Sequence, residues 1–124
     1  MQDYADWVLD SLDPDRSIIT YRLYRQHTWQ QGFVNVKDLS CIGRDLAKTV
    51  IVDNIAENFR LQIENGIYIK SWFDDMNDTA LIDLLPVLVE LAKKRVPDVR
   101  EALQMYRDRI TRQIAQGKCS LPLI

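Results

Sequence analysis

Cysteine and histidine, the side chains that most often bind zinc, are scarce in this sequence. It contains two cysteines, Cys41 and Cys119, and one histidine, His27. The cysteines lie far apart and form no Cys-x-x-Cys pair, so the ligand spacing of a zinc site is missing. A disulfide between them is an alternative, although nothing in the sequence requires one. We therefore expect an intracellular protein with reduced thiols, and a histidine that lies in a loop or packs against neighbours.

An excess of one charge sign and a long apolar run are also missing. The 16 Lys and Arg residues against 18 Asp and Glu residues give a net charge of −2. This balance excludes a global electrostatic footprint for nucleic acid or an anionic membrane. The longest uncharged apolar run, Leu84 to Val89, is far too short to cross a bilayer, and the first residues show no targeting pattern. We expect a soluble protein with no membrane segment here and no direct contact with nucleic acid.

The sequence does contain enough apolar residues to build a core. Apolar residues make up 47% and charged residues 27% of the chain. This composition excludes disorder and is ordinary for a soluble protein. With 124 residues, the chain is one small domain or one piece of a larger domain.

Residues 49–54 are the centre of the predicted fold. Residues 50–52 are three consecutive β-branched residues, a pattern typical of a strand buried on both faces in a parallel sheet covered by helices. Asp53 and Asn54 follow where the strand ends, at the edge where open α/β sheets bind ligands. Their oxygen atoms suit a hard cation such as Mg²⁺. The alternative is that both residues only end the strand and begin a turn.

Further extended segments are predicted on either side of this strand. Residues 17–25 form a β-prone run with enough alternation for a strand, and residues 67–70 predict a second short buried strand after a turn at Asn65. Gly32 indicates a turn into a short extended piece that ends at Lys37. An ammonium group at that position can reach the sheet edge and pair with phosphate; the alternative is a solvated surface lysine.

Three helices are predicted. Residues 3–12 have apolar side chains at helical spacing. Asp78 is expected to cap a long helix whose apolar residues cover almost its full circumference, so we expect it to be buried against the sheet and bent at Pro86. The last helix is expected to begin at Pro97 and to end at Gly117. Its later half is basic, which indicates a solvated face or, alternatively, a contact with an acidic partner.

Short segments that occur in order along this chain resemble one known family. They are Tyr4-Ala5-Asp6, Arg22-Leu23-Tyr24-Arg25-Gln26-His27, Val36-Lys37-Asp38-Leu39, Gly43-Arg44-Asp45-Leu46, Ile51-Val52-Asp53-Asn54, Ser71-Trp72-Phe73-Asp74-Asp75, Asn77-Asp78-Thr79 and Leu84-Leu85-Pro86. They are similar to the C-terminal half of the catalytic domain of the small C-terminal-domain phosphatases, also called NLI-interacting-factor-like or Dullard-like phosphatases (FCP/SCP homology domain), of the haloacid dehalogenase superfamily. The resemblance runs from Tyr4 to about Leu103.

The resemblance implies an α/β fold. The expected structure is the C-terminal part of a haloacid-dehalogenase-like Rossmannoid fold, with a parallel sheet flanked by helices and an extra C-terminal helix. Residues 1–103 would form the C-terminal part of the phosphatase domain, and residues 104–124 a helical extension.

The resemblance also implies a chemistry. Members of this family hydrolyse phosphoserine or phosphothreonine in proteins through an aspartyl-phosphate, with Mg²⁺ as cofactor. Asn54 matches the residue that binds Mg²⁺, and Asp53 matches the carboxylate that orients the metal's waters. Lys37 matches the lysine that neutralises the nucleophile and the phosphoryl oxygens. Arg25 and Tyr4 match residues that line the substrate groove.

One essential part of the family's site is missing from this sequence. The nucleophile lies in an Asp-x-Asp-x-Thr signature on an earlier strand, which is also the central strand of the sheet. Residues 13–17 repeat the aspartate spacing but are expected to lie in a turn. We therefore expect the chain alone to be inactive. It is expected to be part of a longer protein, one of two chains that complete the domain, or a domain that has reorganised. The alternative is a non-catalytic binding or structural subunit, as in the mitochondrial inner-membrane translocase receptor of this family.

Overall fold

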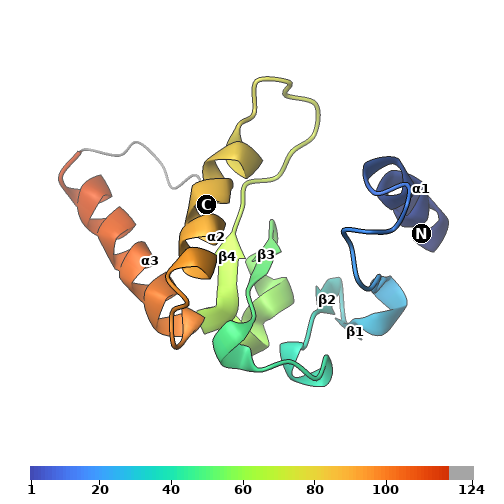
Figure 1. The fold of residues 1–124 in the computed structure, drawn as a ribbon, viewed down its shortest axis with the longest axis horizontal. Helices are drawn as coiled ribbons and strands as arrows, with labels where there is room; N and C mark the ends of the chain where they lie inside the picture. Colours follow the sequence, from blue (N-terminus) through green and yellow to red (C-terminus); the bar gives the residue numbers. More distant parts are fainter. Residues whose placement is uncertain (118–124) are drawn as a thin grey trace.

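The computed structural model describes residues 1–117 and contains three α-helices, short 3₁₀ segments and two small sheets in that range (Figure 1). In chain order the elements are α1 Gln2–Leu12, η1 Arg25–His27, β1 Trp29–Gln31, β2 Val34–Val36, η2 Leu39–Cys41, η3 Leu46–Lys48, β3 Ile51–Asp53, η4 Ala56–Asn65, β4 Gly66–Tyr68, α2 Ala80–Lys93 and α3 Val99–Ala115. Along the longest axis, α3 and α2 lie at one end, β4 and β3 in the middle, and the β1–β2 hairpin and α1 at the other end (Figure 1). The α/β fold class expected from the sequence is confirmed.

The predicted strand at residues 49–54 is present as β3, and it pairs in parallel with β4. Ile51 lies opposite Gly66, and Asp53 lies opposite Tyr68. The segment η4 connects the two strands and forms the crossover. Within the described residues β3 has β4 as its only strand neighbour, so Ile51 and Val52 are half-buried. The expected burial on both faces is therefore only partly observed.

The junction between η4 and β4 is tightly packed. The Nδ2 group of Asn65, whose side chain is almost fully buried, donates to the carbonyl oxygens of Leu46 at 2.7 Å and Thr49 at 2.8 Å. A Cβ atom at Gly66 would lie 2.1 Å from Cε2 of Phe59. The Asn65-Gly66 pair, which the sequence predicted to be a turn, lies where η4 ends and β4 begins. The pair fixes the start of β4. The Asn65 amide binds the chain just before β3, and Gly66 leaves room for the ring of Phe59.

The core lies where α2 and α3 pack against β3 and β4. Ile67, Leu84 and Leu103 are its buried centre, and half-buried residues that include Val52 and Leu88 surround them. The prediction that α2 is buried around almost its full circumference is wrong. Three of its apolar side chains are largely exposed: Leu81 at 71%, Ile82 at 69% and Leu85 at 58%. A two-stranded sheet covers only one stripe of the helix, so the other apolar side chains face outward.

The predicted strand at residues 17–25 is absent, and the cause is Asp13. Its carboxylate, which is almost fully buried, accepts hydrogen bonds from the backbone N–H groups of Ser17, Ile18 and Ile19. These bonds, with the one from Ile19 foremost, hold the pKa of Asp13 below its usual value. Backbone donors that a strand would give to a neighbouring strand are thus bound to a side chain. The segment is a loop, and Ile18 is 77% exposed.

The other elements follow the sequence closely. Gly32, at a φ of +61°, turns β1 into β2. Pro86 lies within α2. Asp98 caps α3 by accepting a hydrogen bond from the backbone N–H of Arg100 at 2.9 Å. At the other end of this helix Gly117 has a φ of +70°, the left-handed conformation expected of a residue that ends a helix.

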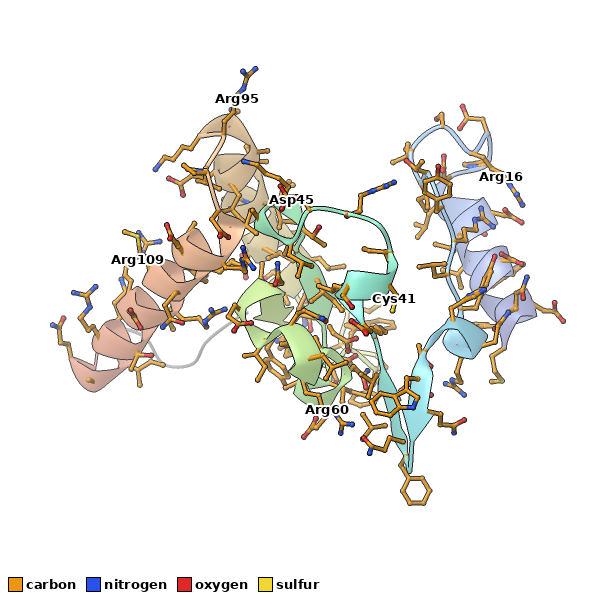
Figure 2. The ribbon with its side chains drawn as sticks, turned by 90° about the horizontal axis from the view of Figure 1, so that it is seen from below. Arg16, Cys41, Asp45, Arg60, Arg95 and Arg109 are labelled. Carbon is orange, nitrogen blue, oxygen red and sulfur yellow. The ribbon has the colours of Figure 1, made fainter. Side chains whose placement is uncertain are left out.

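Helix α3 is continuous across residue 103, where the sequence suggested that an extension begins. Arg95 precedes α3 in the chain and points away from the molecule, whereas Arg109 lies on α3 itself (Figure 2). The guanidinium of Arg109 stacks over the ring of Tyr106 at 5.5 Å.

Cys41 is an exposed free cysteine, and Cys119 lies outside the described residues. Among the helices of residues 1–117, each is too short or too polar to cross a membrane.

Candidate functional site

Two charged residues predicted from the sequence meet at the sheet edge. Lys37 directly follows β2, and Asp53 is the last residue of β3. The ammonium Nζ of Lys37 lies 2.6 Å from Oδ2 of Asp53. The side chain of Asp53 is 3% exposed, whereas that of Lys37 is 45% exposed. The carboxylate is therefore a buried anion that holds an ammonium group whose other side faces solvent.

The carboxylate of Asp53 has further donors on its own side of the site. Its Oδ1 accepts a hydrogen bond from the backbone N–H of Ile55 at 2.9 Å, and the Nδ2 group of Asn58 lies 3.3 and 3.4 Å from its two oxygens. The carbonyl oxygen of Asn58 accepts a hydrogen bond from the N–H of Lys37 at 2.7 Å. Asn58, which is buried, therefore contacts Asp53 through its side chain and Lys37 through its backbone carbonyl. A buried charge with this many partners is held in a fixed position.

The third predicted residue at this edge, Asn54, has a different environment. Its side chain is exposed, and its Nδ2 group donates to Oγ of Ser71 at 3.0 Å. Asn54 directly follows β3, and Ser71 lies three residues after the end of β4, so the pair lies beyond the carboxyl ends of two parallel strands. The bond engages the amide nitrogen of Asn54 and leaves its side-chain oxygen unengaged.

These residues provide a partial donor set for Mg²⁺. Both oxygens of Asp53 already accept hydrogen bonds, which suits a carboxylate beside the ion better than one bound directly to it. Asn54 offers one oxygen. Within residues 1–117 no group of three or more His, Cys, Asp and Glu side chains is placed to hold a metal ion. Because Mg²⁺ is usually bound by one or two protein groups together with water and phosphate, Asn54 fits as one ligand of such a site.

A cavity of about 590 Å³ lies next to Lys37. Lys37 and Arg25, which belongs to η1, both line it, together with the polar residues Asn35 and Asn58. Aliphatic side chains that include Ile42 and Ile51 form much of the remaining wall. The cavity therefore combines two cationic groups with an apolar wall, an arrangement that suits an anionic group attached to a larger molecule.

The residues around Arg25 belong to a polar network that joins α1 to the loop before η1. Arg22 forms ion pairs with Asp6 at 3.1 Å and Asp10 at 2.8 Å. The hydroxyl of Tyr24 donates to Asp6, and this bond raises the pKa of Tyr24 above its usual value. The backbone N–H of Tyr24 also donates to Nδ1 of His27, the last residue of η1, and the centroids of the two rings lie 5.9 Å apart, so His27 packs against a neighbour. The network thus holds the backbone on either side of Arg25.

Tyr4 is not brought into the cavity. It lies on α1, is 67% exposed and contacts the ring of Trp7 with a centroid distance of 6.3 Å. The residues of α1 and its N-cap that line the cavity are Ala5 and Met1. The structure thus brings Lys37, Asp53 and Arg25 together, places Asn54 at the adjoining strand end, and leaves Tyr4 outside.

Sequence reasoning missed Asn58, Ser71 and Asn35. The position of Ser71 could have been found, because it follows a strand predicted to run parallel to β3, and the ends of such strands meet at one edge. Asn58 carries no such signal, since its contact with Asp53 depends on the turn that η4 makes. Asn35 could have been noticed two residues before Lys37, because alternate residues of a strand share a face.

Comparison with known proteins gives the family of this chain. Residues 1–100 match the family of NLI interacting factor-like phosphatases. A probable C-terminal domain small phosphatase of Dictyostelium discoideum is 50% identical over 105 residues, which are 85% of this chain and 33% of that protein. CTD nuclear envelope phosphatase 1 of Xenopus tropicalis is 43% identical over 103 residues, covering 83% of this chain and 41% of that protein.

A third relative bears a different name. The mitochondrial import inner membrane translocase subunit TIM50 of Kluyveromyces lactis is 41% identical over 105 residues, covering 85% of this chain and 22% of that protein. The chain therefore spans between about a fifth and two fifths of these relatives. The match to the family covers most of the chain, and the resemblance drawn from its short segments is confirmed. This chain belongs to the NLI interacting factor-like phosphatase family.

Proposed function

We propose that this chain carries the anion-binding part of a phosphoprotein phosphatase site that acts on phosphoserine or phosphothreonine. The observation that carries the proposal is the ammonium of Lys37, held 2.6 Å from the buried carboxylate of Asp53 and lining one cavity with Arg25. Two cations beside an aliphatic wall suit a phosphate monoester on a polypeptide. Relatives named as phosphatases, one of them 50% identical, support the same reading.

The proposed reaction has two steps. An aspartate carboxylate attacks phosphorus and forms an aspartyl-phosphate, while the serine or threonine oxygen leaves and takes up a proton from a general acid in the same segment as the nucleophile. Water then gives a proton back to that group and attacks the phosphorus of the intermediate, which releases inorganic phosphate and restores the carboxylate. Lys37 binds the phosphoryl oxygens and Asp53 holds its ammonium from behind. Arg25 contacts the substrate inside the cavity, whereas Tyr4 can contact only a part of the substrate that extends beyond it.

Mg²⁺ is the proposed cofactor. When bound, it would offset the negative charge of the phosphate. Asn54 is the residue that would hold it, through the side-chain oxygen that its bond to Ser71 leaves unengaged. Asp53 adjoins that position and would contact the water around the ion.

The nucleophile has to come from outside the described residues. Among the described residues that line the cavity, Asp38 alone has a carboxylate. Its Oδ1 accepts hydrogen bonds from the hydroxyl and backbone N–H of Ser40 and from Nε2 of Gln62. These bonds, the hydroxyl of Ser40 foremost, lower the pKa of Asp38 to about 2. A carboxylate held in this way is a poor nucleophile, so we expect a preceding segment of a longer protein, or a second chain, to supply the aspartate.

The test is complementation. The segment of the Dictyostelium relative that precedes the matching region is added to this chain, and hydrolysis of para-nitrophenyl phosphate is followed with Mg²⁺. We expect no turnover by the chain alone and turnover by the mixture. Lys37→Met is expected to abolish it, whereas Lys70→Met is not, because Lys70 has a similar exposure of 48% but pairs with Asp78 at 3.5 Å. Turnover by the chain alone that Asn54→Ala abolishes would show that the nucleophile lies within it.

A second candidate function is a non-catalytic binding subunit. The observation that favours it is the 41% identity to a translocase subunit. On this reading the cavity holds a polypeptide without hydrolysing it, and the complemented mixture binds a phosphorylated ligand or a peptide but gives no phosphate release. The names of the relatives refer to mitochondria and the nuclear envelope, and we propose an intracellular location for this chain as well.

A further inference from the structure

Asn35 lies beside Lys37 on the same face of one strand. In β2 successive side chains point to opposite sides, so the fully buried Val36 faces the interior while residues 35 and 37 share the other face. Both Asn35 and Lys37 line the cavity of about 590 Å³. The Cα atoms of residues two apart on a strand are separated by about 6.6 Å. This spacing is comparable with the reach from a phosphoserine phosphate to the peptide groups beside it.

The side-chain amide of Asn35 is not satisfied by the fold. Its Oδ1 is buried, and it is the one buried side-chain atom of the described residues that lacks a hydrogen-bond partner. An unpaired buried acceptor is unfavourable for folding, and such atoms are rare in native proteins. A strand position of this kind is better occupied by a β-branched residue. Asparagine at residue 35 is therefore a poor choice for stability, which indicates that its side chain serves a ligand.

We propose that Asn35 binds the main chain of a phosphorylated polypeptide while Lys37 and Arg25 bind its phosphate. This inference rests on the proposed function and adds what the site recognises beside the phosphate. A carboxamide has one acceptor and one donor group, which match the N–H and C=O of a peptide group. A phosphate dianion offers only acceptors, so it leaves Oδ1 unpaired. The Oδ1 is buried in the structure, and because the terminal torsion of asparagine is broad, binding is proposed to rotate the amide so that this oxygen meets the peptide.

The experiment compares two phosphate monoesters. N-acetyl-phosphoserine N-methylamide has peptide groups on both sides of the phosphorylated residue, and phenyl phosphate has none. Binding of each to the full chain is measured by titration calorimetry or by chemical shifts. We expect Asn35→Val to weaken binding of the capped phosphoserine about fivefold to tenfold, as for the loss of one or two hydrogen bonds. Binding of phenyl phosphate is expected to stay within about twofold.

The second measurement is stability against urea, because replacing an asparagine with a merely structural role would lower the stability. We expect Asn35→Val to unfold at the same or a higher urea concentration than the parent. Asn35→Thr, which also lacks the amide and suits a strand, is expected to behave in the same way. Gln30→Val is the matched control, since Gln30 lies opposite Asn35 on β1 and does not line the cavity.

The outcomes separate this inference from the proposed function. The role of Asn35 is refuted, and the phosphate site stands, if both Asn35 variants bind the two esters equally weakly or bind both as well as the parent does. The same holds if the variants unfold at lower urea concentration without a selective loss of binding to the capped phosphoserine. If neither ester binds the parent, or if Lys37→Met leaves binding of both unchanged, the proposed function is refuted and the role of Asn35 with it.

Discussion

Removing either member of the Lys37–Asp53 pair is expected to have unequal effects on stability. Asp53 is 3% exposed and accepts from Lys37, from the backbone N–H of Ile55 and from the buried amide of Asn58. Asp53→Ala leaves the last two donors without their acceptor. Because an orphaned buried donor costs about 1–3 kcal/mol, we expect Asp53→Ala to lower the free energy of unfolding by about 3 kcal/mol.

Lys37→Met is expected to cost much less. The ammonium of Lys37 is 45% exposed, so water already solvates part of it, and its loss leaves Asp53 with the donors of Ile55 and Asn58. Partly exposed ion pairs are worth at most about 1 kcal/mol, and we expect a loss of that size. Lys70→Met is the control, with an expected change of less than about 0.5 kcal/mol.

The assay is urea unfolding followed by far-UV circular dichroism for the parent, the single variants and the Asp53→Ala/Lys37→Met double variant. The reasoning predicts that the double variant is hardly less stable than Asp53→Ala, because the charge that Lys37 paired with is already gone. Equal losses for the two single variants would contradict it. They would mean that the ammonium is as strongly desolvated as the carboxylate, and that Lys37 cannot turn toward a ligand at low cost.

The remaining predictions concern the η4–β4 junction and acidic pH. Gly66→Ala brings a Cβ to 2.1 Å from Phe59, and urea unfolding should show a loss of about 2–3 kcal/mol. Asn65→Ala removes the donor of two carbonyl groups, with an expected loss of about 2 kcal/mol in the same assay. Because the pKa of Asp38 is lowered from 3.8 to about 2, its contribution to stability is present above about pH 4 and lost as the pH falls toward 2. Urea midpoints between pH 5 and 3 should fall, and Asp38→Asn should flatten that fall.

Local rules were sufficient to predict the elements on which the site is built. The β-branched run before Asp53 predicted β3, and its parallel partner was expected at residues 67–70. Gly117 was recognised as the residue that ends α3, because capping depends on the residue and its nearest neighbours. The helix begins at Val99, after its cap Asp98, and not at Pro97 as expected. The sequence also placed Asn54 at the end of β3, but its contact with Ser71 was not predicted.

Features set by distant contacts could not be predicted in this way. The run at residues 17–25 has strand propensity, but the carboxylate of Asp13 binds three of its backbone donors, and propensity is weaker than such a competing set of hydrogen bonds. The apolar circumference of α2 indicated full burial, yet Leu81 is 71% exposed. How much of a helix is covered depends on the number of strands beneath it, which the pattern of the helix alone does not contain.

If a further strand completes the sheet, we expect it to complete the proposed active site as well. Within residues 1–117 β3 pairs on one side only, and Ile51 and Ile55, from this strand and the turn after it, line the same cavity as Lys37. A parallel strand added along the open side of β3 would end at the edge where Asp53 and Asn54 lie, so its last side chains would reach Lys37. An added segment at 100 times its dissociation constant would stabilise the chain by about 2.7 kcal/mol. Turnover in the complemented mixture should therefore rise together with the free energy of unfolding, and turnover without stabilisation would mean that the nucleophile reaches Lys37 from another direction.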